Sequence, residues 1–444
     1  MLMRTYADLH IHSRYARACS PQLSPERIDL WCRIKGVGLV STGDFTHPKW
    51  LAELQEKLEP AEPGLYRLKQ QYRLTDPRFK PKAEVNVRFI CGTEVACIYK
   101  HGDATRRVHH CLYAPSLEVV AKINGELTRL GKNLKADGRP ILGLSSKDLL
   151  KLILETDERS VLIPAHAWTP WFAIFGSKSG YDSIEECFEE LTPHIFAIET
   201  GLSSDPAMNW QLSALDSVAL VSHSDAHSLP NLGREADIFE GSELSYDNFM
   251  NAIRHASPKA VAAGEDKNLP LRLAGTIEFF PDEGRYHYDG HRECKVRLSP
   301  SESAEHKGIC PVCKRPLTIG VLNRVNELSD RLVGTKPPGA LPFTSLIELD
   351  KVIAQAQGVK GRATKVVEAE YWGLASAGGG ELQALLDVPV AELAQVTTER
   401  VVEAIRRLRQ GKVASISPGY DGEYGTISLF SESEAPPSPQ AHLL

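Results

Sequence analysis

The sequence lacks the long apolar runs that mark membrane proteins. In its 444 residues no stretch approaches the ~18 consecutive apolar residues of a membrane span. The opening residues, MLMRTYADLHIH, lead into charged side chains without the apolar core of a secretory signal. With 42% hydrophobic and 24% charged residues, the composition is that of an ordinary globular protein. We therefore expect a cytoplasmic protein with a sizeable core and no membrane partner.

The chain also lacks an excess of positive charge. Its formal net charge is −6, so any surface that binds nucleic acid must be a local patch. One candidate is segment 64–82, which carries six Lys or Arg residues against Asp76 alone, with Tyr66, Tyr72 and Phe79 between them. This segment could follow a phosphate backbone, although a solvated charged loop explains it equally well.

The nine cysteines are an odd number and form no disulfide framework. Six are scattered, and the other three lie within twenty residues of one another: Cys294, Cys310 and Cys313. With His291 they make a His-x-x-Cys and a Cys-x-x-Cys pair separated by fifteen residues, the spacing of a closed structural zinc site. His287 or His306 could replace His291 as the fourth ligand. Zinc bound here would fold the segment rather than catalyse.

Short β-branched runs alternate with helical segments through residues 1–270. Runs such as VGLVSTGDF, VRFICGTEV and VALVSHSDAH indicate buried strands, and segments such as PERIDLWCRIKG and SKDLLKLILETD have helical periodicity. The alternation predicts an α/β domain with a parallel sheet or barrel. Polar functional residues follow the strands, at the end where such folds place their sites.

Three further units are expected after residue 270. Residues 271–335 contain the zinc-binding insert and begin with TIEFFPDEGRYHYDG, which resembles a hairpin turning at Glu283-Gly284. A Pro/Gly-rich linker then leads to a C-terminal α+β region, residues 336–430, with helices and a hairpin that turns on Asp421-Gly422. We expect residues 431–444 to be a disordered tail.

Histidine and carboxylate side chains recur at the ends of the predicted strands. His10 and His12 follow the strand YADLH, and because alternate residues of a strand share a face, both rings can reach one metal ion. The predicted ligands are His10, His12, Asp44, His47, Glu94, His109, His110, His166, Asp225 and His227. Such donors suit zinc, manganese or iron, and a shared carboxylate such as Glu94 holds two ions about 3.5 to 4 Å apart.

The adjacent His109 and His110 must point to opposite faces of their strand, so only one of them is expected to bind metal. The spacing to the following apolar strand favours His109. The other ring is expected to be buried and hydrogen-bonded.

Several motifs of the chain resemble those of a known protein superfamily. The opening DLHIHS, the Glu of GTEV, the His pair, the isolated His166 and the closing HSDAH resemble the ordered motifs of the polymerase-and-histidinol-phosphatase (PHP) superfamily. This resemblance covers residues 8 to about 235 and implies a distorted (β/α)7 barrel with up to three metal ions. More narrowly, STGDFTHPKW, PAHAWTPWFAIFGSKSG, IETGLSSDPAMNW and PGYDGEYG resemble the endonuclease Q family of DNA repair nucleases, over nearly the whole chain.

The resemblance also implies how the ligands are shared. One ion would be surrounded by four of them: His10, His12, Glu94 and Asp225. Glu94 would bridge to a second ion held by His109 and His166, with His47 and His227 at a third.

Two departures from the family pattern bear on the third site. Arg14, Arg17 and Cys19 stand where many superfamily members have an acidic or His residue, and Asp44 is separated from His47 by two residues, so it could instead orient a ligand imidazole.

The chemistry implied is phosphodiester hydrolysis by metal-activated water. Divalent metals, here zinc, manganese or magnesium, lower the pKa of a bound water from 15.7 toward about 7, so no Ser or Cys nucleophile is required. Asp225, Glu94 and His227 are the expected catalytic residues. The aromatic and polar residues after His166 suit base stacking and phosphate contact, although they could equally pack the barrel rim. The predicted substrate-binding residues are Arg17, Trp168, Trp171, Phe172, Ser177, Lys178, Ser179 and Asn209.

We therefore expect a DNA repair endonuclease that cuts on the 5′ side of deoxyinosine, deoxyuridine or an abasic site, with a repair or replication clamp as a further candidate partner. One alternative is a phosphatase for a small phosphorylated metabolite or nucleotide; the zinc insert and segment 64–82 argue against it, because a monoesterase requires neither. Another is an inactive zinc-containing scaffold that binds DNA. The intact series of ligands argues against that.

Overall fold

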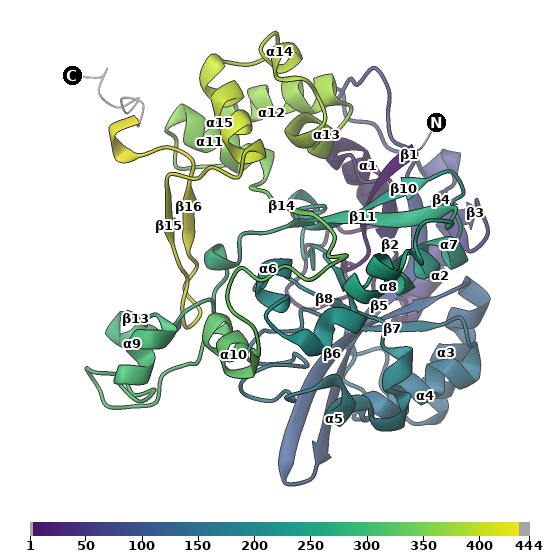
Figure 1. Ribbon diagram of the computed structural model, residues 1–444. Coiled ribbons are helices and arrows are strands. Elements are labelled where there is room, and N and C mark those ends of the chain that lie inside the picture. The colour runs from purple at the N-terminus through teal and green to yellow at the C-terminus, as the bar shows by residue number, and fades with distance from the viewer. Residues whose placement is uncertain (1–2, 435–444) are drawn as a thin grey trace.

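The computed structural model describes residues 3–434 as a mixed α/β protein built on one large sheet (Figure 1). Ten strands form it, in the order β14-β11-β10-β1-β2-β5-β4-β3, with β6 joined to β5 and β7 joined to β6. They are β1 Met3–Asp8, β2 Leu39–Ser41, β3 Leu58–Pro60, β4 Leu65–Leu68, β5 Arg88–His101, β6 Ala104–Ala114, β7 Val161–Pro164, β10 Ala236–Gly241, β11 Leu271–Glu278 and β14 Phe343–Ser345. No helix in this part of the chain is long and apolar enough to cross a membrane.

The parallel centre of the sheet consists of β1, β2 and β5. Successive residues face two separate apolar clusters: Val40 and Phe89 lie in one, Leu39 and Ile90 in the other. Both faces of the sheet are therefore buried, which explains the continuous apolar runs in the sequence. Helix α1 (Pro25–Lys35) follows β1, and helix α2 (Pro48–Lys57) follows β2.

Strands β5 and β6 form a long antiparallel hairpin. It extends beyond the other strands at the lower edge of Figure 1. Strand β7 pairs only with the inner part of β6, from His110 to Tyr113. Helices α3 (Leu117–Arg129) and α4 (Ser146–Thr156) lie between β6 and β7 in the chain, and each begins at a serine whose side chain accepts a hydrogen bond from a backbone N–H of the first turn.

The predicted (β/α)7 barrel is not confirmed. Strands β8 (Ala197–Glu199) and β9 (Ala219–Val221) pair in parallel as a separate small sheet. Single backbone hydrogen bonds connect neighbouring segments, from Ala167 to Glu199 and from His12 to Ala226. The strands of residues 3–434 do not form one continuous hydrogen-bonded ring, and the closed barrel stays a prediction. Short helices connect this half of the molecule: α5 Ile184–Phe188, α6 Pro206–Asn209, α7 Tyr246–Arg254 and α8 Pro258–Ala263.

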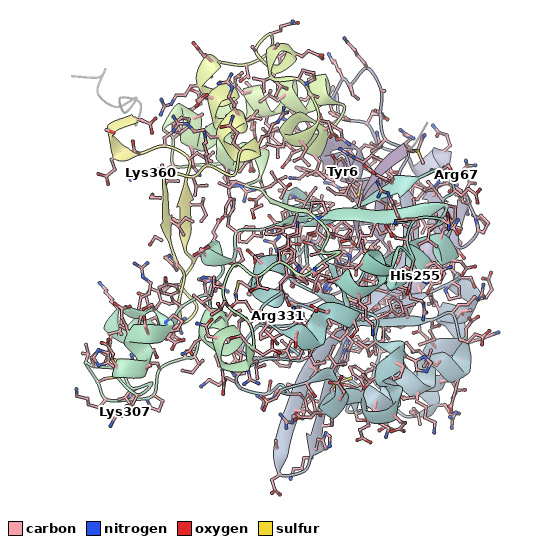
Figure 2. All side chains as sticks on the ribbon, in the orientation of Figure 1. Tyr6, Arg67, His255, Lys307, Arg331 and Lys360 are labelled. Carbon is pink, nitrogen blue, oxygen red and sulfur yellow. The ribbon has the colours of Figure 1, made fainter. Side chains whose placement is uncertain are left out.

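The prediction of a hairpin that turns at Glu283-Gly284 was wrong. Strand β11 pairs with β10 and β14, and the chain after it forms a 3-10 turn at Pro281–Glu283. The insert contains its own small elements: β12 Asp289–His291, β13 Val296–Leu298, α9 Pro300–Glu305 and α10 Val321–Leu328. The part with β13 and α9 projects from the main body at the lower left of Figure 2, where Lys307 is labelled, whereas Arg324 of α10 donates to the carbonyls of Phe175 and Tyr181.

The C-terminal helices lie together at the top of Figure 1. They are α11 Leu349–Gln357, α12 Lys365–Gly378, α13 Glu381–Leu386, α14 Val390–Leu393 and α15 Glu399–Arg409. The hairpin predicted around Asp421-Gly422 is confirmed, with β15 (Ser415–Ser417) antiparallel to β16 (Thr426–Ser428). Its turn docks on the insert, where Asp421 accepts hydrogen bonds from the N–H of Arg292 at 2.8 Å and the hydroxyl of Thr318 at 2.7 Å.

The tail predicted to be disordered begins within the described residues. Glu432–Glu434 form a 3-10 turn, and Glu434 pairs with Arg407 at 2.6 Å. The prediction was wrong for residues 431–434, because this ion pair ties them to α15. Residues 435–444 lie outside the described residues.

Candidate metal centre

The turn after β1 brings His10 and His12 to the same side of the chain. Ile11, between them, points into the apolar core and forms a parallel bridge with Ala226. The N–H of His12 donates to the carbonyl of Ala226 at 3.1 Å. This bridge joins the turn after β1 to the turn after β9, so the two imidazoles lie beside Asp225.

Four predicted ligands form a first group. The ligand atoms of His10, His12, Glu94 and Asp225 all lie within 4.8 Å of one another. Nε2 of His12 lies 3.1 Å from Oε2 of Glu94 and 3.1 Å from Oδ1 of Asp225. Nε2 of His10 lies 3.5 Å and 3.6 Å from the same two oxygens. Two nitrogens and two carboxylate oxygens thus lie close enough together to hold one metal ion.

A second group shares Glu94. Its other oxygen, Oε1, lies 2.6 Å from Nδ1 of His109 and 3.2 Å from Nε2 of His166. The ligand atoms of Glu94, His109 and His166 again lie within 4.8 Å of one another. Each oxygen of Glu94 therefore faces a different group, the arrangement in which one carboxylate bridges two ions.

The donors fit divalent cations. Nε2 of His10 is buried and has no hydrogen-bond partner among the described residues, although it points at two carboxylates. Burial opposes the charged forms of Glu94 and Asp225, yet the surrounding cationic groups hold the pKa of both well below its ordinary value. The buried carboxylate of Glu94 and the partly exposed carboxylate of Asp225 repel each other at this distance unless positive charge lies between them. A mixed set of imidazole and carboxylate donors suits zinc, manganese or iron.

Asp44 lies outside both groups. Its Oδ1 is 2.9 Å from Nδ1 of His12, and its Oδ2 accepts hydrogen bonds from the N–H and hydroxyl of Ser13 at 2.6 and 2.7 Å. Because a carboxylate here favours the proton on Nδ1, the lone pair of His12 is directed to Nε2, which faces the first group. The structure thus places Asp44 as a residue that orients a ligand rather than as a ligand.

The predicted third group does not assemble in the described residues. His47 packs its ring against Tyr15, with 4.4 Å between centroids, and its Nδ1 is buried without a partner. His227 lies beside His12, with 4.6 Å between centroids, and its Nδ1 is 2.9 Å from the backbone carbonyl of Asp225. Neither residue belongs to a group of three or more candidate ligands within residues 3–434.

His110 turns away from the metal centre, as expected for one of two adjacent strand residues. Its Nε2 lies 2.8 Å from the hydroxyl of Ser146 on α4. Burial lowers the pKa of His110 to about 3, so the ring is neutral. Its inclusion among the candidate ligands was wrong, because its side chain lies on the opposite face of β6 from His109.

Glu199 supports the centre in a role that we did not predict. It lies 3.0 Å from Nδ1 of His10, 2.9 Å from Nδ1 of His223, and accepts a hydrogen bond from the N–H of His166 at 2.7 Å. The ligand atoms of His10, Cys111 and Glu199 also lie within 4.8 Å of one another. Although burial raises it, the pKa of Glu199 falls to about 2 because His10 and His223 flank the carboxylate. Its position at the end of β8 was the signal available in the sequence.

Arg139 is a second residue that the sequence did not indicate. Its Nη1 lies 2.9 Å from Oε2 of Glu94, and the side chain remains 28% exposed. It belongs to a loop whose Gly138 lies against Asp44, where a Cβ atom would come within 2.5 Å of Oδ2. The predicted phosphate ligand Arg17 pairs with Asp137 of the same loop at 3.2 Å, and its side chain is 82% exposed. The loop thus places the guanidinium of Arg139 beside Glu94 and holds the exposed Arg17 through Asp137.

The aromatic loop after His166 divides into a buried and an accessible part. Trp168 is fully buried and donates from Nε1 to Oδ1 of the buried Asn209 at 2.8 Å. The prediction that these two contact substrate was wrong, because each satisfies the other inside the core. Phe172 is partly exposed and packs on the ring of His109, with 4.6 Å between centroids, and Trp171 lies against Tyr286.

The polar residues that follow are similarly divided. Lys178 is exposed. Ser179 is buried and donates from its hydroxyl to the carbonyl of Arg107 at 3.2 Å, so its predicted phosphate contact was wrong. Ser177 is partly exposed, and its hydroxyl lies 3.4 Å from the carbonyl of Ile319 near the insert.

The insert contains a separate group of candidate ligands. Those of His291, Cys294, Cys310 and Cys313 lie within 4.8 Å of one another. This is the set that the spacing favoured. His287, one of the alternatives, is buried instead against Asp282 at 3.4 Å and stacks on Tyr288. Three thiols and one imidazole suit a closed tetrahedral zinc site.

Sequence comparisons place the chain among uncharacterized relatives. Residues 348–412 match the family model of the MJ0043 C-terminal domain. The chain is 30% identical over 271 residues to the uncharacterized protein MJ0043 of Methanocaldococcus jannaschii, a match that covers 60% of this chain and only 31% of that relative. It is 26% identical over 441 residues to the uncharacterized protein YqxK of Bacillus subtilis, covering 96% of this chain and 100% of YqxK.

Structural comparisons are more informative. The chain matches a crystal structure of the lesion-specific endonuclease PfuEndoQ from Pyrococcus furiosus with a TM-score of 0.81 and 28% identity, covering 97% of this chain and 96% of that one. It also matches endonuclease Q in complex with a 27-mer duplex substrate that has an abasic lesion at the active site, with a TM-score of 0.81, 28% identity and coverage of 99% and 100%. The resemblance to endonuclease Q that the sequence motifs indicate is therefore confirmed over nearly the whole chain.

Proposed function

We propose that this chain is a metal-dependent DNA repair endonuclease that hydrolyses the phosphodiester on the 5′ side of a damaged or deaminated base. The observation that carries the proposal is the pair of ligand groups joined by Glu94, in a chain that matches endonuclease Q almost from end to end. Deoxyinosine, deoxyuridine and abasic sites are the substrates we propose. A repair or replication clamp finds no support in these observations and is not part of the proposal.

Each of two ions would be held by its own set of ligands, with Glu94 shared between them. His10, His12 and Asp225 would hold one ion, His109 and His166 the other, and Glu94 both. Bound ions would supply Lewis-acid stabilisation of the phosphoryl oxygens and lower the pKa of a water. Backbone strain supports these positions, since His166 and Asp225 both adopt positive φ, at 30° and 46°.

His227 is suited to accept a proton. Its Nδ1 faces the backbone carbonyl of Asp225, which can only accept, so the neutral ring carries its hydrogen on Nδ1. Its Nε2 is then the free acceptor. Burial lowers the pKa of His227, which favours the neutral ring with a free lone pair on Nε2. With its side chain 31% exposed, it lies where a water could reach it.

Arg139 and Phe172 are suited to position the substrate. Arg139 offers a partly exposed guanidinium beside Glu94, where it could hold a non-bridging phosphate oxygen. Phe172 presents a ring beside His109, where a base displaced from the duplex could stack. Both would contact the substrate rather than hold the ions.

The test is cleavage of end-labelled duplexes that carry one deoxyinosine, deoxyuridine or abasic site, with Mg²⁺ or Mn²⁺, mapped on a sequencing gel. We expect a nick on the 5′ side of the lesion with wild type, and none with Glu94→Gln or Asp225→Asn, whose folding is checked by circular dichroism. Intact DNA together with phosphate release from small monoesters would favour the phosphatase instead. About one ion per chain, found in the insert alone, would favour the inactive scaffold.

A further inference from the structure

The β5–β6 hairpin carries residues of the metal centre at its base and exposed cations toward its tip. Its cross-strand pairs, from base to tip, are Glu94 with Cys111, Ala96 with His109, Ile98 with Arg107, and Lys100 with Thr105. Because side chains alternate along a strand, these pairs share one face of the hairpin. Arg107 and Lys100 therefore continue the face that presents Glu94 and His109 to the metal centre.

The opposite face packs against the protein. The hydroxyl of Tyr99 lies 2.8 Å from that of Tyr181, and Nδ1 of His101 lies 2.9 Å from the same hydroxyl. The guanidinium of Arg106 lies 4.1 Å from the centroid of the Tyr181 ring. These contacts attach the outer part of the hairpin to the segment after the aromatic loop. The opposite face, which carries Lys100 and Arg107, is therefore held in a fixed orientation.

Lys100 and Arg107 are exposed and, within residues 3–434, neither side chain forms an ion pair. Asp103 at the tip is the single acidic residue of segment 98–107. The N–H of Arg107 donates to the carbonyl of Ser179 at 3.2 Å, which brings the exposed Lys178 next to it in the chain to the same edge of the hairpin. This part of the surface is therefore positively charged although the whole chain is acidic.

The spacing of the cations matches a DNA strand. At about 3.3 Å per residue, Arg107 lies about 7 Å and Lys100 about 13 Å beyond His109 along the hairpin. A strand of duplex DNA advances about 3.4 Å per nucleotide along the helix axis. The two cations thus reach positions about two to four nucleotides from a phosphate held at the metal centre.

We propose that Lys100 and Arg107 bind backbone phosphates of duplex DNA about two to four nucleotides from the scissile phosphate, on one side of it only. This inference rests on the proposed function. The contacts would fix the register of the duplex without reading its bases, since phosphates carry no sequence information. The hairpin thus determines how much duplex the enzyme requires on that side of a lesion.

The first test compares two double variants. Lys100→Ala/Arg107→Ala removes the cations of the hairpin, and Lys122→Ala/Lys151→Ala removes two exposed cations from α3 and α4 as a control. Single-turnover cleavage of an abasic duplex at increasing enzyme concentration gives the half-saturating concentration and the maximal rate. For the hairpin variant we expect roughly tenfold weaker half-saturation, a salt slope smaller by about two, and a maximal rate within about twofold of wild type. The control should match wild type in all three.

A second test locates the contacts. Duplexes with single neutral methylphosphonate linkages at each position around the lesion should weaken wild type at about two to four nucleotides on one side. They should weaken the hairpin variant no further there, because the contact is already lost. Equal half-saturation and salt slope in the two double variants would overturn the proposal.

Failure of the hairpin proposal can be told apart from failure of the proposed function. If wild type cleaves the lesion and the hairpin variant behaves like the control, only the hairpin proposal fails. If no lesion is cleaved, fluorescence anisotropy on a lesion-free duplex still compares the variants, and an unchanged salt slope there would again contradict a phosphate contact.

Discussion

Glu199 Oε2 lies 3.0 Å from Nδ1 of His10, on the side of the imidazole opposite the nitrogen that faces Glu94. The same carboxylate contacts His223, whose Nε2 lies 3.2 Å from Asp237. Burial lowers the pKa of His223, but Asp237 and Glu199 raise it to about 10, so this ring is cationic and holds Glu199 in place. A carboxylate behind a ligand imidazole fixes its orientation and raises its basicity.

Replacing Glu199 by Gln should therefore weaken metal binding without removing a ligand. We expect the affinity of the ion held by His10 to fall roughly 10- to 100-fold, while the insert keeps its own metal. Metal analysis after dialysis against graded chelator measures this. Glu155→Gln, at an exposed position on α4, is the control. Unchanged retention of both ions in Glu199→Gln would show that His10 needs no such partner.

His109 and His110 are adjacent but should respond in opposite ways to replacement by Ala. His109→Ala should lose one ion and keep its stability, because the ring ends at the metal centre. His110→Ala should keep both ions but lose about 1 to 3 kcal/mol of unfolding free energy, because the buried Ser146 hydroxyl on α4 loses its acceptor and keeps only the hydrogen bond from Tyr99. Metal content and urea unfolding of both variants provide the measurement. Loss of an ion from His110→Ala would reverse the assignment.

The sequence predicted the members of both ligand groups from their place beside apolar runs: His10, His12, His166 and Asp225 follow short strands, whereas Glu94 and His109 lie inside the long strands β5 and β6. Strand ends meet at one edge of a sheet, so a list of polar residues there is already a spatial prediction. Arg139 was not predicted as a site residue, because its loop has no periodic pattern and no strand next to it in the sequence. Trp168 was misplaced for a related reason: in an irregular loop, spacing does not say which side chain points inward, and only the hydrogen bond to Asn209 shows it.

The sequence predicted individual turns and strands, but not which distant strands pair with each other. The hairpin at Asp421-Gly422 follows from turn residues between two short strands, and it is present. Strand β11 instead pairs with β14 across a long insertion, at Thr276 with Phe343. No local signal distinguishes such a pairing from a nearby hairpin, which explains the error at Glu283-Gly284.

Cys310→Ser should unfold the insert locally. Cys310 is buried in a small cluster with Val296 and Leu317, which is too small to hold the insert together without metal. We expect loss of about one zinc per chain, faster proteolysis within the insert, and weaker DNA binding, with the ions of the main centre retained. Val312→Ala, at a 66% exposed position of the same insert, should change none of these. Resistance of Cys310→Ser to proteolysis would mean that the insert folds without zinc.

Glu278 should make stability depend on pH. Its carboxylate is buried with the hydroxyls of Thr200 and Thr276, and burial raises the pKa to about 8 from an ordinary 4.5, aided by the negative charges of Asp205 and Asp237. Between these values the folded chain keeps a proton that the unfolded chain releases. Its contribution is thus fully present below about pH 4.5 and is lost as pH rises to about 8, by at most ~1.4 kcal/mol per pH unit.

Glu278→Gln removes this titration while keeping a buried polar group that can bond both hydroxyls. Urea unfolding of the variant should therefore vary less with pH between about 4.5 and 8, and the variant should gain on wild type as pH rises through that window. Glu243→Gln, at an exposed position before α7, is the control, and the comparison between variants cancels the pH dependence that metal binding adds to all of them. Parallel stability curves for wild type and Glu278→Gln would show that Glu278 is ionised in the folded protein and that its charge is compensated within the core.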